Sequence, residues 1–73
     1  DGGVNMYPNL EKELNSNKMS YRSAAKAIGM SESTFRDKFY KGNFSIHEAF
    51  MIHHLLLPKY ELEYLFESAA DKS

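Results

Sequence analysis

The chain has 73 residues, no cysteine and a formal net charge of −1, from nine lysines and arginines against ten acidic residues. This length allows one domain, and the absence of cysteine excludes a disulfide scaffold and a thiolate metal site. A hydrophobic share of 42%, with no apolar run near the length of a membrane span, excludes collagen, disorder, a transmembrane protein and a large enzyme with a deep pocket, and leaves small binding modules open.

The first part of the chain is predicted to be a short irregular N-terminal segment followed by a short helix. Residues 1–5 have no helical periodicity and are expected to be a disordered lead or a remnant placed before the natural start. Residues 6–67 are expected to form the folded domain, and residues 68–73 a frayed tail. Leu10 and Leu14 stand four residues apart and predict the first helix, which ends at a run of asparagine and serine turn formers.

A second helix is predicted over residues 21–28. Ser20 is a typical N-cap, and Gly29 can adopt the positive φ that often ends a helix. Ser31 is a second N-cap only two residues later, so the next helix must begin almost at once and at an angle to the last. This spacing is typical of a helix-turn-helix.

The third helix is predicted over residues 32–41, closed by Gly42. Phe35 and Phe39 lie four residues apart on it and are expected to face inward. On a helical wheel, this orientation turns the polar side chains of the third helix toward solvent.

Two further helices complete the predicted fold. Ser45 and Glu48 have the spacing of a capping box and open a fourth helix, which Pro58 stops, and residues 59–67 are expected to form a fifth. No segment alternates with period two, so we expect an all-α protein, a compact five-helix bundle with a helix-turn-helix on helices 2 and 3. The expected core includes Ala25, Ile28, Phe35, Phe39, Ile46, Phe50, Leu62 and Leu65.

A resemblance rests on motifs spread over most of the chain. They are Ala25, Gly29, Met30-Ser31 and Ser33-Thr34-Phe35, then Phe35-Arg36-Asp37-Lys38-Phe39, Gly42, Phe44-Ser45-Ile46, Glu48-Ala49 and Tyr64-Leu65-Phe66. Over residues 6–67 the chain resembles the Cro/CI-type family of phage and bacterial repressors, in particular the small phage-repressor-like proteins of Gram-positive bacteria. It departs from the family at Tyr21, where relatives often have glutamine.

The resemblance implies a lambda-repressor-like DNA-binding domain. It further implies a phage or prophage-type transcriptional regulator, acting as a repressor that occupies an operator in double-stranded DNA. The implied location is cytoplasmic. One recognition helix reads only a few base pairs, so we expect a homodimer, formed either in solution or only on DNA.

Charge is divided by segment in a way that supports this interpretation. Residues 18–43 carry six basic and two acidic side chains, whereas the segments before and after them are acidic. The residues expected to read bases lie on the outward face and first turn of the third helix. They are Glu32, Ser33, Arg36, Asp37 and Tyr40. Those expected to contact phosphates are Tyr21, Arg22, Thr34, Lys38, Lys41 and Asn43.

Two of these roles depend on the chemistry of the side chain. Arg36 can donate two hydrogen bonds to guanine O6 and N7, so it is the expected specifying contact. Glu32 can either accept from cytosine N4 or serve the helix start through capping and ion pairing, and the sequence leaves both roles open.

No catalytic, metal or cofactor chemistry is expected. His53 and His54 are adjacent and point about 100° apart on a helix, and His47 lies nearly two turns away, so they do not predict a metal site. The serines lack a His-Asp partner set, and those at helix starts are explained as caps. We therefore expect no enzyme activity, no cofactor, no small-molecule substrate and no membrane partner.

Two other functions are compatible with the sequence. The first is a protein-interaction module on the same fold, an antirepressor or antitoxin-like partner binder that uses its acidic last helix. The second is an N-terminal fragment of a longer repressor. For a dimer, the expected contacts are Tyr60, Tyr64 or Leu57, because the neighbouring acidic residues belong away from DNA.

Overall fold

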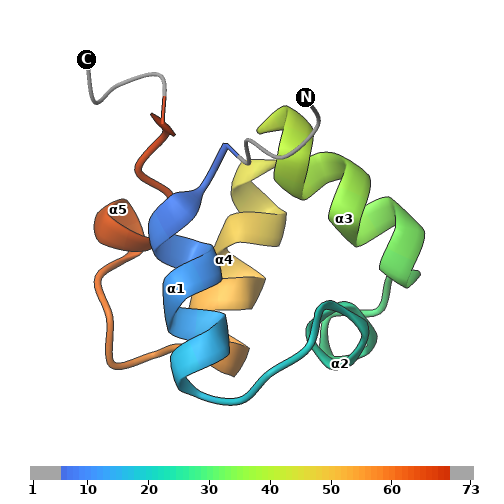
Figure 1. The fold of residues 1–73 in the computed structure, drawn as a ribbon, viewed down its shortest axis with the longest axis horizontal. Coiled ribbons are helices and arrows are strands. Elements are labelled where there is room, and N and C mark those ends of the chain that lie inside the picture. Colours follow the sequence, from blue (N-terminus) through green and yellow to red (C-terminus); the bar gives the residue numbers. More distant parts are fainter. Residues whose placement is uncertain (1–5, 70–73) are drawn as a thin grey trace.

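The computed structural model describes residues 6–69, and all regular structure in this range is helical (Figure 1). The predicted all-α class is confirmed for these residues, among which there is no strand. The radius of gyration is 11.2 Å, close to the value of about 11 Å expected for a compact chain of this length. The helices are α1 (Pro8–Ser16), α2 (Tyr21–Ala27), α3 (Glu32–Lys41), α4 (Ile46–Leu56) and α5 (Leu62–Leu65).

The helices place α3 at the edge of the molecule. In Figure 1, α3 lies on one side and α5 on the other, with α1 and α4 between them. Helix α2 packs against α3 and α4, and α5 packs against α1 and α4. One long face of α3 is therefore left without a helical neighbour in this view.

The starts of α3 and α4 are set by serine caps, as predicted. The Ser31 hydroxyl accepts a hydrogen bond from the Thr34 backbone N–H at 3.2 Å. The Glu48 N–H donates to the Ser45 hydroxyl at 3.1 Å, and the Ser45 N–H donates to the Glu48 carboxylate at 2.9 Å, which completes the predicted capping box. Gly42 ends α3 in the left-handed region at φ +74°, where a Cβ would also collide with the Met6 side chain.

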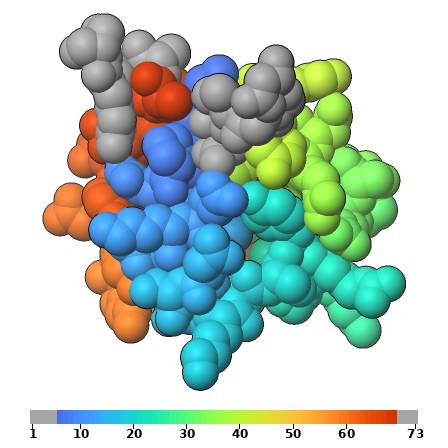
Figure 2. Space-filling view, viewed as in Figure 1, coloured from blue at the N-terminus to red at the C-terminus, as the bar shows by residue number. Residues whose placement is uncertain are grey.

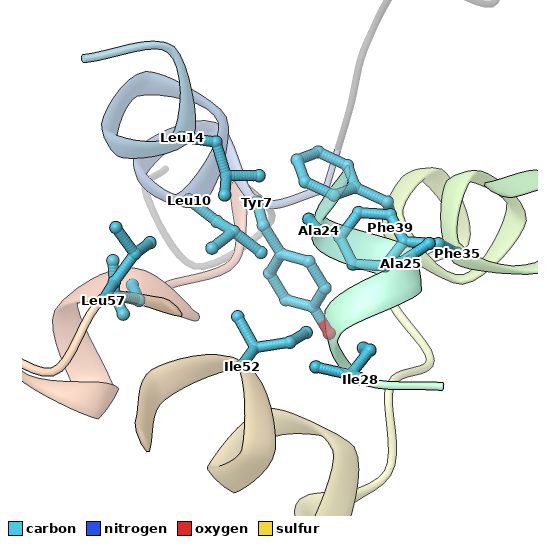
Figure 3. Packing of buried hydrophobic residues seen from close by; sticks show 11 residues of the cluster. Tyr7, Leu10, Leu14, Ala24, Ala25, Ile28, Phe35, Phe39, Ile52 and Leu57 are labelled. Atoms are coloured by element: carbon cyan, nitrogen blue, oxygen red, sulfur yellow. The ribbon is translucent and has the colours of Figure 1, made fainter. Parts of the chain in front are cut away.

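The core lies where α1, α2, α3 and α4 converge (Figure 3). Phe35 and Phe39 are completely buried, with ring centroids 6.0 Å apart. The predicted core residues that are buried are Ala25, Ile28, Phe35, Phe39 and Leu65. The core also includes Tyr7, Leu10, Leu14, Ala24, Ile52 and Leu57.

The predicted inward face of the fourth helix is wrong. Ile46 is 75% exposed and Phe50 is 52% exposed, whereas Ile52 is fully buried. Seven of the eleven residues of α4 are apolar, so periodicity alone could not identify the buried face. Packing against α2 and α5 selects the face centred on Ile52, and Leu62, also predicted as core, is only half-buried.

The fifth helix is shorter than predicted, and its tyrosines form part of the packing. Helix α5 covers four residues rather than 59–67, because Leu57 turns into the core and the following residues form a turn. The Tyr64 hydroxyl donates to the buried Glu13 carboxylate at 2.7 Å, and Asn17 donates to the Tyr60 hydroxyl at 3.3 Å. Tyr60 and Tyr64, expected as dimer contacts, are therefore half-buried by this packing, and Leu57 is buried and unavailable for such a contact.

Contacts near the two ends join the beginning and end of the described segment. The Ala69 N–H donates to the Met6 carbonyl at 2.8 Å, and the Ser68 hydroxyl lies 3.1 Å from the Met6 sulfur. The lead predicted at residues 1–5 and the rest of the tail predicted at 68–73 lie outside the described residues. Within residues 6–69, no helix has the length and apolar character needed to cross a bilayer.

Candidate nucleic-acid interface

The connection between α2 and α3 is a short turn built around one glycine. Gly29 has φ +79°, a left-handed conformation that glycine adopts without a Cβ penalty. The Met30 N–H donates to the Ala25 carbonyl at 3.0 Å, and Ser31 caps α3 immediately afterwards. Ala24 and Ala25 are each 1% exposed, and their small side chains let α2 pack closely against its neighbours.

The outward side of α3 carries a shallow hollow. It is lined by Ser33, Arg36, Asp37, Tyr40 and Lys41. Four of the five predicted base-reading residues thus lie together, and the fifth, Glu32, is connected to them through Arg36. The α3 side chains form the green surface on the right of the space-filling view (Figure 2), so this helix is accessible from outside.

Arg36 is held in place by two neighbours. Its Nη2 atom lies 2.6 Å from a Glu32 carboxylate oxygen, and its guanidinium carbon lies 5.1 Å from the centre of the Tyr21 ring. The side chain remains 50% exposed. The guanidinium is therefore restrained at the mouth of the hollow, and it must leave the Glu32 carboxylate before both of its donor edges can reach a base.

A second ion pair of the same spacing lies near the end of α3. Lys41 Nζ is 3.2 Å from Asp37 Oδ1, and both side chains are more than half exposed. Exposed pairs at this spacing stabilise a helix by only about 0.3–0.5 kcal/mol, so they exchange readily for other partners. Both ion pairs place an acidic group beside a cation that was predicted to contact DNA.

Lys38 points toward α4. Its Nζ atom lies 3.3 Å from a Glu48 carboxylate oxygen, and its side chain is 29% exposed. The hydrogen bond from the Ser45 backbone N–H is the main cause that lowers the pKa of Glu48, and the nearby positive charge of Lys38 lowers it further. Lys38 therefore stabilises the α3–α4 junction, which is a role that sequence reasoning did not identify.

Tyr21 supports α3 from behind. Its ring centre lies 6.0 Å from that of Phe35 and 5.1 Å from that of Phe39, and its hydroxyl donates to Glu11 at 3.3 Å. Burial, assisted by Tyr40 and Glu11, raises the pKa of Tyr21. Because the Tyr21 hydroxyl already has a partner, a phosphate contact would have to displace Glu11.

The other predicted phosphate contacts lie at the surface. Arg22, Thr34 and Asn43 are all exposed. Thr34 is also part of the α3 cap, because its hydroxyl accepts from Ser31 at 2.9 Å. The predicted positioning residues therefore lie around α3, except that Lys38 and Tyr21 are engaged in packing.

A group of glutamates near the end of the described chain lies away from α3. Glu61, Glu63 and Glu67 are exposed on and beside α5, on the opposite side of the molecule from α3 in Figure 1. Lys26 and Lys41 are exposed on α2 and α3. The three glutamates near α5 are thus distant from α3, although α3 itself carries Glu32 and Asp37.

Comparison of the chain with protein-family models, curated proteins and solved structures finds no significant match. Among residues 6–69, no group of three or more histidine, aspartate or glutamate side chains is arranged to hold a metal ion.

One surface feature was not predicted from the sequence. An apolar groove lies between α4 and α5, with a volume of about 550 Å³. It is lined by Ile46, Ala49, Phe50, Leu62, Glu63, Phe66 and Glu67. The sequence feature that could have indicated this groove is the excess of apolar residues in α4, since one helix face cannot bury seven of them.

Proposed function

We propose that this chain is a sequence-specific double-stranded DNA-binding regulator of the phage or prophage repressor type, with α2 and α3 as its helix-turn-helix. The observation that carries the proposal is the outward hollow of α3, where Ser33, Arg36, Asp37 and Tyr40 converge beside Lys41. The residue types in this hollow are donors and acceptors suited to base edges. The resemblance to Cro/CI-type repressors adds support from the sequence.

The dimensions of α3 suit a major groove. An α-helix with its side chains is about 10–12 Å in diameter, which matches the major-groove width of about 12 Å, and the ten residues of α3 give it a length of about 15 Å. Helix α2 and the glycine turn hold α3 at the molecular edge, so its outward face can approach a duplex. The core side chains Phe35 and Phe39 fix the rotation of α3, because both are fully buried.

In the proposed mechanism, Arg36 supplies most of the sequence discrimination. DNA binding exchanges the Arg36–Glu32 ion pair for a two-donor contact with guanine. Lys41, Arg22 and Asn43 contact phosphates and set the orientation of α3 without reading sequence. Occupation of an operator in the cytoplasm would then block transcription.

The experiment compares Arg36→Ala with Lys41→Ala by titrating labelled duplexes with protein at several salt concentrations. Arg36→Ala should lose about 1–3 kcal/mol against the preferred duplex and relax the preference at one base pair. Lys41→Ala should weaken binding to preferred and random duplexes alike. It should also reduce the slope of log binding constant against log salt concentration by about one. Equal losses on both duplexes for both variants would refute the assignment of Arg36.

A second candidate function is a protein-interaction module on the same fold, such as an antirepressor or antitoxin-like binder. The specific observation in its favour is the apolar groove between α4 and α5, whose acidic members are Glu63 and Glu67. Absence of salt-sensitive binding to any duplex would favour this alternative over DNA recognition.

A further inference from the structure

The ring of Tyr21 connects α2 to an outward side chain of α3. Tyr21 is the first residue of α2, and the guanidinium carbon of Arg36 lies 5.1 Å from the centre of its ring. A guanidinium within about 6 Å of an aromatic ring centre is attracted by the negative face of the ring. The contact therefore reaches from the supporting helix to the side chain that the proposed function makes the specifying contact.

The Tyr21 ring is held in place independently of Arg36. Its centre lies 5.1 Å from that of Phe39 and 6.0 Å from that of Phe35, and both phenylalanines are fully buried. Its hydroxyl donates to the Glu11 carboxylate of α1 at 3.3 Å. Because the core and α1 fix the ring, Tyr21 offers Arg36 a surface whose position does not depend on bound DNA.

The two restraints on Arg36 differ in what they leave available. The Glu32 carboxylate lies 2.6 Å from Nη2 and so occupies a donor that a base would need. An aromatic ring can hold a guanidinium by stacking, which leaves the N–H donors at its edges available for hydrogen bonds. DNA binding can thus replace the Glu32 contact and keep the Tyr21 contact, which becomes stronger when the duplex excludes water.

We propose that Tyr21 is a positioning residue for recognition, whose ring aims the Arg36 guanidinium and thereby sets the preference at the base pair that Arg36 reads. This role replaces the phosphate contact predicted for Tyr21, because the hydroxyl already donates to Glu11. The inference rests on the proposed DNA-binding function and adds a residue of α2 to the determinants of specificity. The ring should contribute about two- to five-fold to the affinity for the preferred duplex.

The first test detects the contact without DNA, by nuclear magnetic resonance of the full chain. The side-chain protons of Arg36 should resonate upfield of their usual positions because of the Tyr21 ring current. Tyr21→Phe should keep this shift, and Tyr21→Leu should abolish it. Tyr60→Leu is the matched control, because Tyr60 is also half-buried and has a cation, Lys59, 5.4 Å from its ring centre. Unshifted Arg36 resonances in the wild type overturn the proposal.

The second test titrates two labelled duplexes with each variant. One is the duplex that the wild type enriches from a random pool, and the other differs only at the base pair where Arg36→Ala relaxes the preference. Tyr21→Leu should bind the first duplex about two- to five-fold more weakly and the second with unchanged affinity. Tyr21→Phe and Tyr60→Leu should keep the wild-type ratio of affinities. In the Arg36→Ala background, Tyr21→Leu should not change the ratio further.

Circular dichroism checks that each variant is folded. Equal losses on both duplexes for Tyr21→Leu overturn the proposal. If Tyr21→Leu does not fold, Tyr21→Phe decides: a wild-type ratio with unchanged affinities supports the ring contact, and weaker binding to both duplexes identifies the hydroxyl as a phosphate contact instead. A wild-type chain without any preference among duplexes refutes the proposed function, whereas a selective wild type with a ratio unaffected by Tyr21→Leu refutes this inference alone.

Discussion

Replacing Phe39 with alanine tests the packing that orients α3. The Phe39 side chain is fully buried, and its ring lies 5.1 Å from Tyr21 and 6.2 Å from Tyr7. A buried phenylalanine-to-alanine change costs about 3–5 kcal/mol through lost burial and the cavity left behind. A domain of this length has only about 4–11 kcal/mol of total stability, so most of it should be lost.

The assay is thermal and urea unfolding of the Phe39→Ala variant followed by far-ultraviolet circular dichroism. A loss of 3 kcal/mol corresponds to a fall in Tm of roughly 12–24 °C for a domain of this size. Phe50→Ala is the control, because Phe50 is an exposed residue of the same type, and its effect should stay within about 0.5 kcal/mol. Similar melting temperatures for the two variants would refute the assigned core.

Three further predictions concern charge and the turn. Glu32→Gln should release Arg36 and raise affinity for the preferred duplex by up to about five-fold, since exposed pairs contribute at most about 1 kcal/mol. Reduced affinity for the preferred duplex would instead identify Glu32 as a base-reading residue. Because the fold lowers the pKa of Glu48, the charged carboxylate stabilises the fold at pH values above its unfolded pKa near 4.3. The difference in unfolding free energy between wild type and Glu48→Gln should therefore shrink as pH falls from about 5 through the folded pKa. A difference that persists at about pH 2 would contradict this. Gly29→Ala should destabilise the fold by about 1–2 kcal/mol because of its positive φ, without a steric clash, and an unchanged Tm would argue against the left-handed turn.

The middle of the chain was the most predictable part because its helix ends carry explicit signals. Ser31 and Gly42 mark the two ends of α3, and the predicted bounds 32–41 agree with the structure. Ser45 and Glu48 likewise locate the start of α4. Local hydrogen bonds and backbone preferences determine these boundaries, so they can be deduced without knowledge of tertiary contacts.

The last helix and the exposed face of α4 were not predictable in this way. Tyr60 and Tyr64 have helical spacing, but their hydroxyls hydrogen-bond to residues of α1 and its C-cap, and only Leu62–Leu65 is helical. In α4, apolar residues occur on several faces, so burial of Ile52 rather than Phe50 depends on the neighbouring helices. Long-range contacts decide both features.

Part of the candidate site followed from the sequence and part required coordinates. Once Phe35 and Phe39 are taken as inward, the helical wheel places Arg36 and Tyr40 on the outward side, and both line the observed hollow. The wheel does not show that Lys38 turns toward Glu48 on the next helix. Such a partner depends on the angle between α3 and α4, which the turn and the core set together.

The most direct test of the proposed function is selection of bound duplexes from a random pool by the wild-type chain at moderate salt. The proposed recognition by α3 predicts an enriched motif, arranged as a palindrome with half-sites about one helical turn apart. The same selection with Arg36→Ala should lose the preference at one base pair of each half-site. Recovery of an unenriched pool, with no salt-sensitive binding, would contradict sequence-specific DNA recognition by this chain.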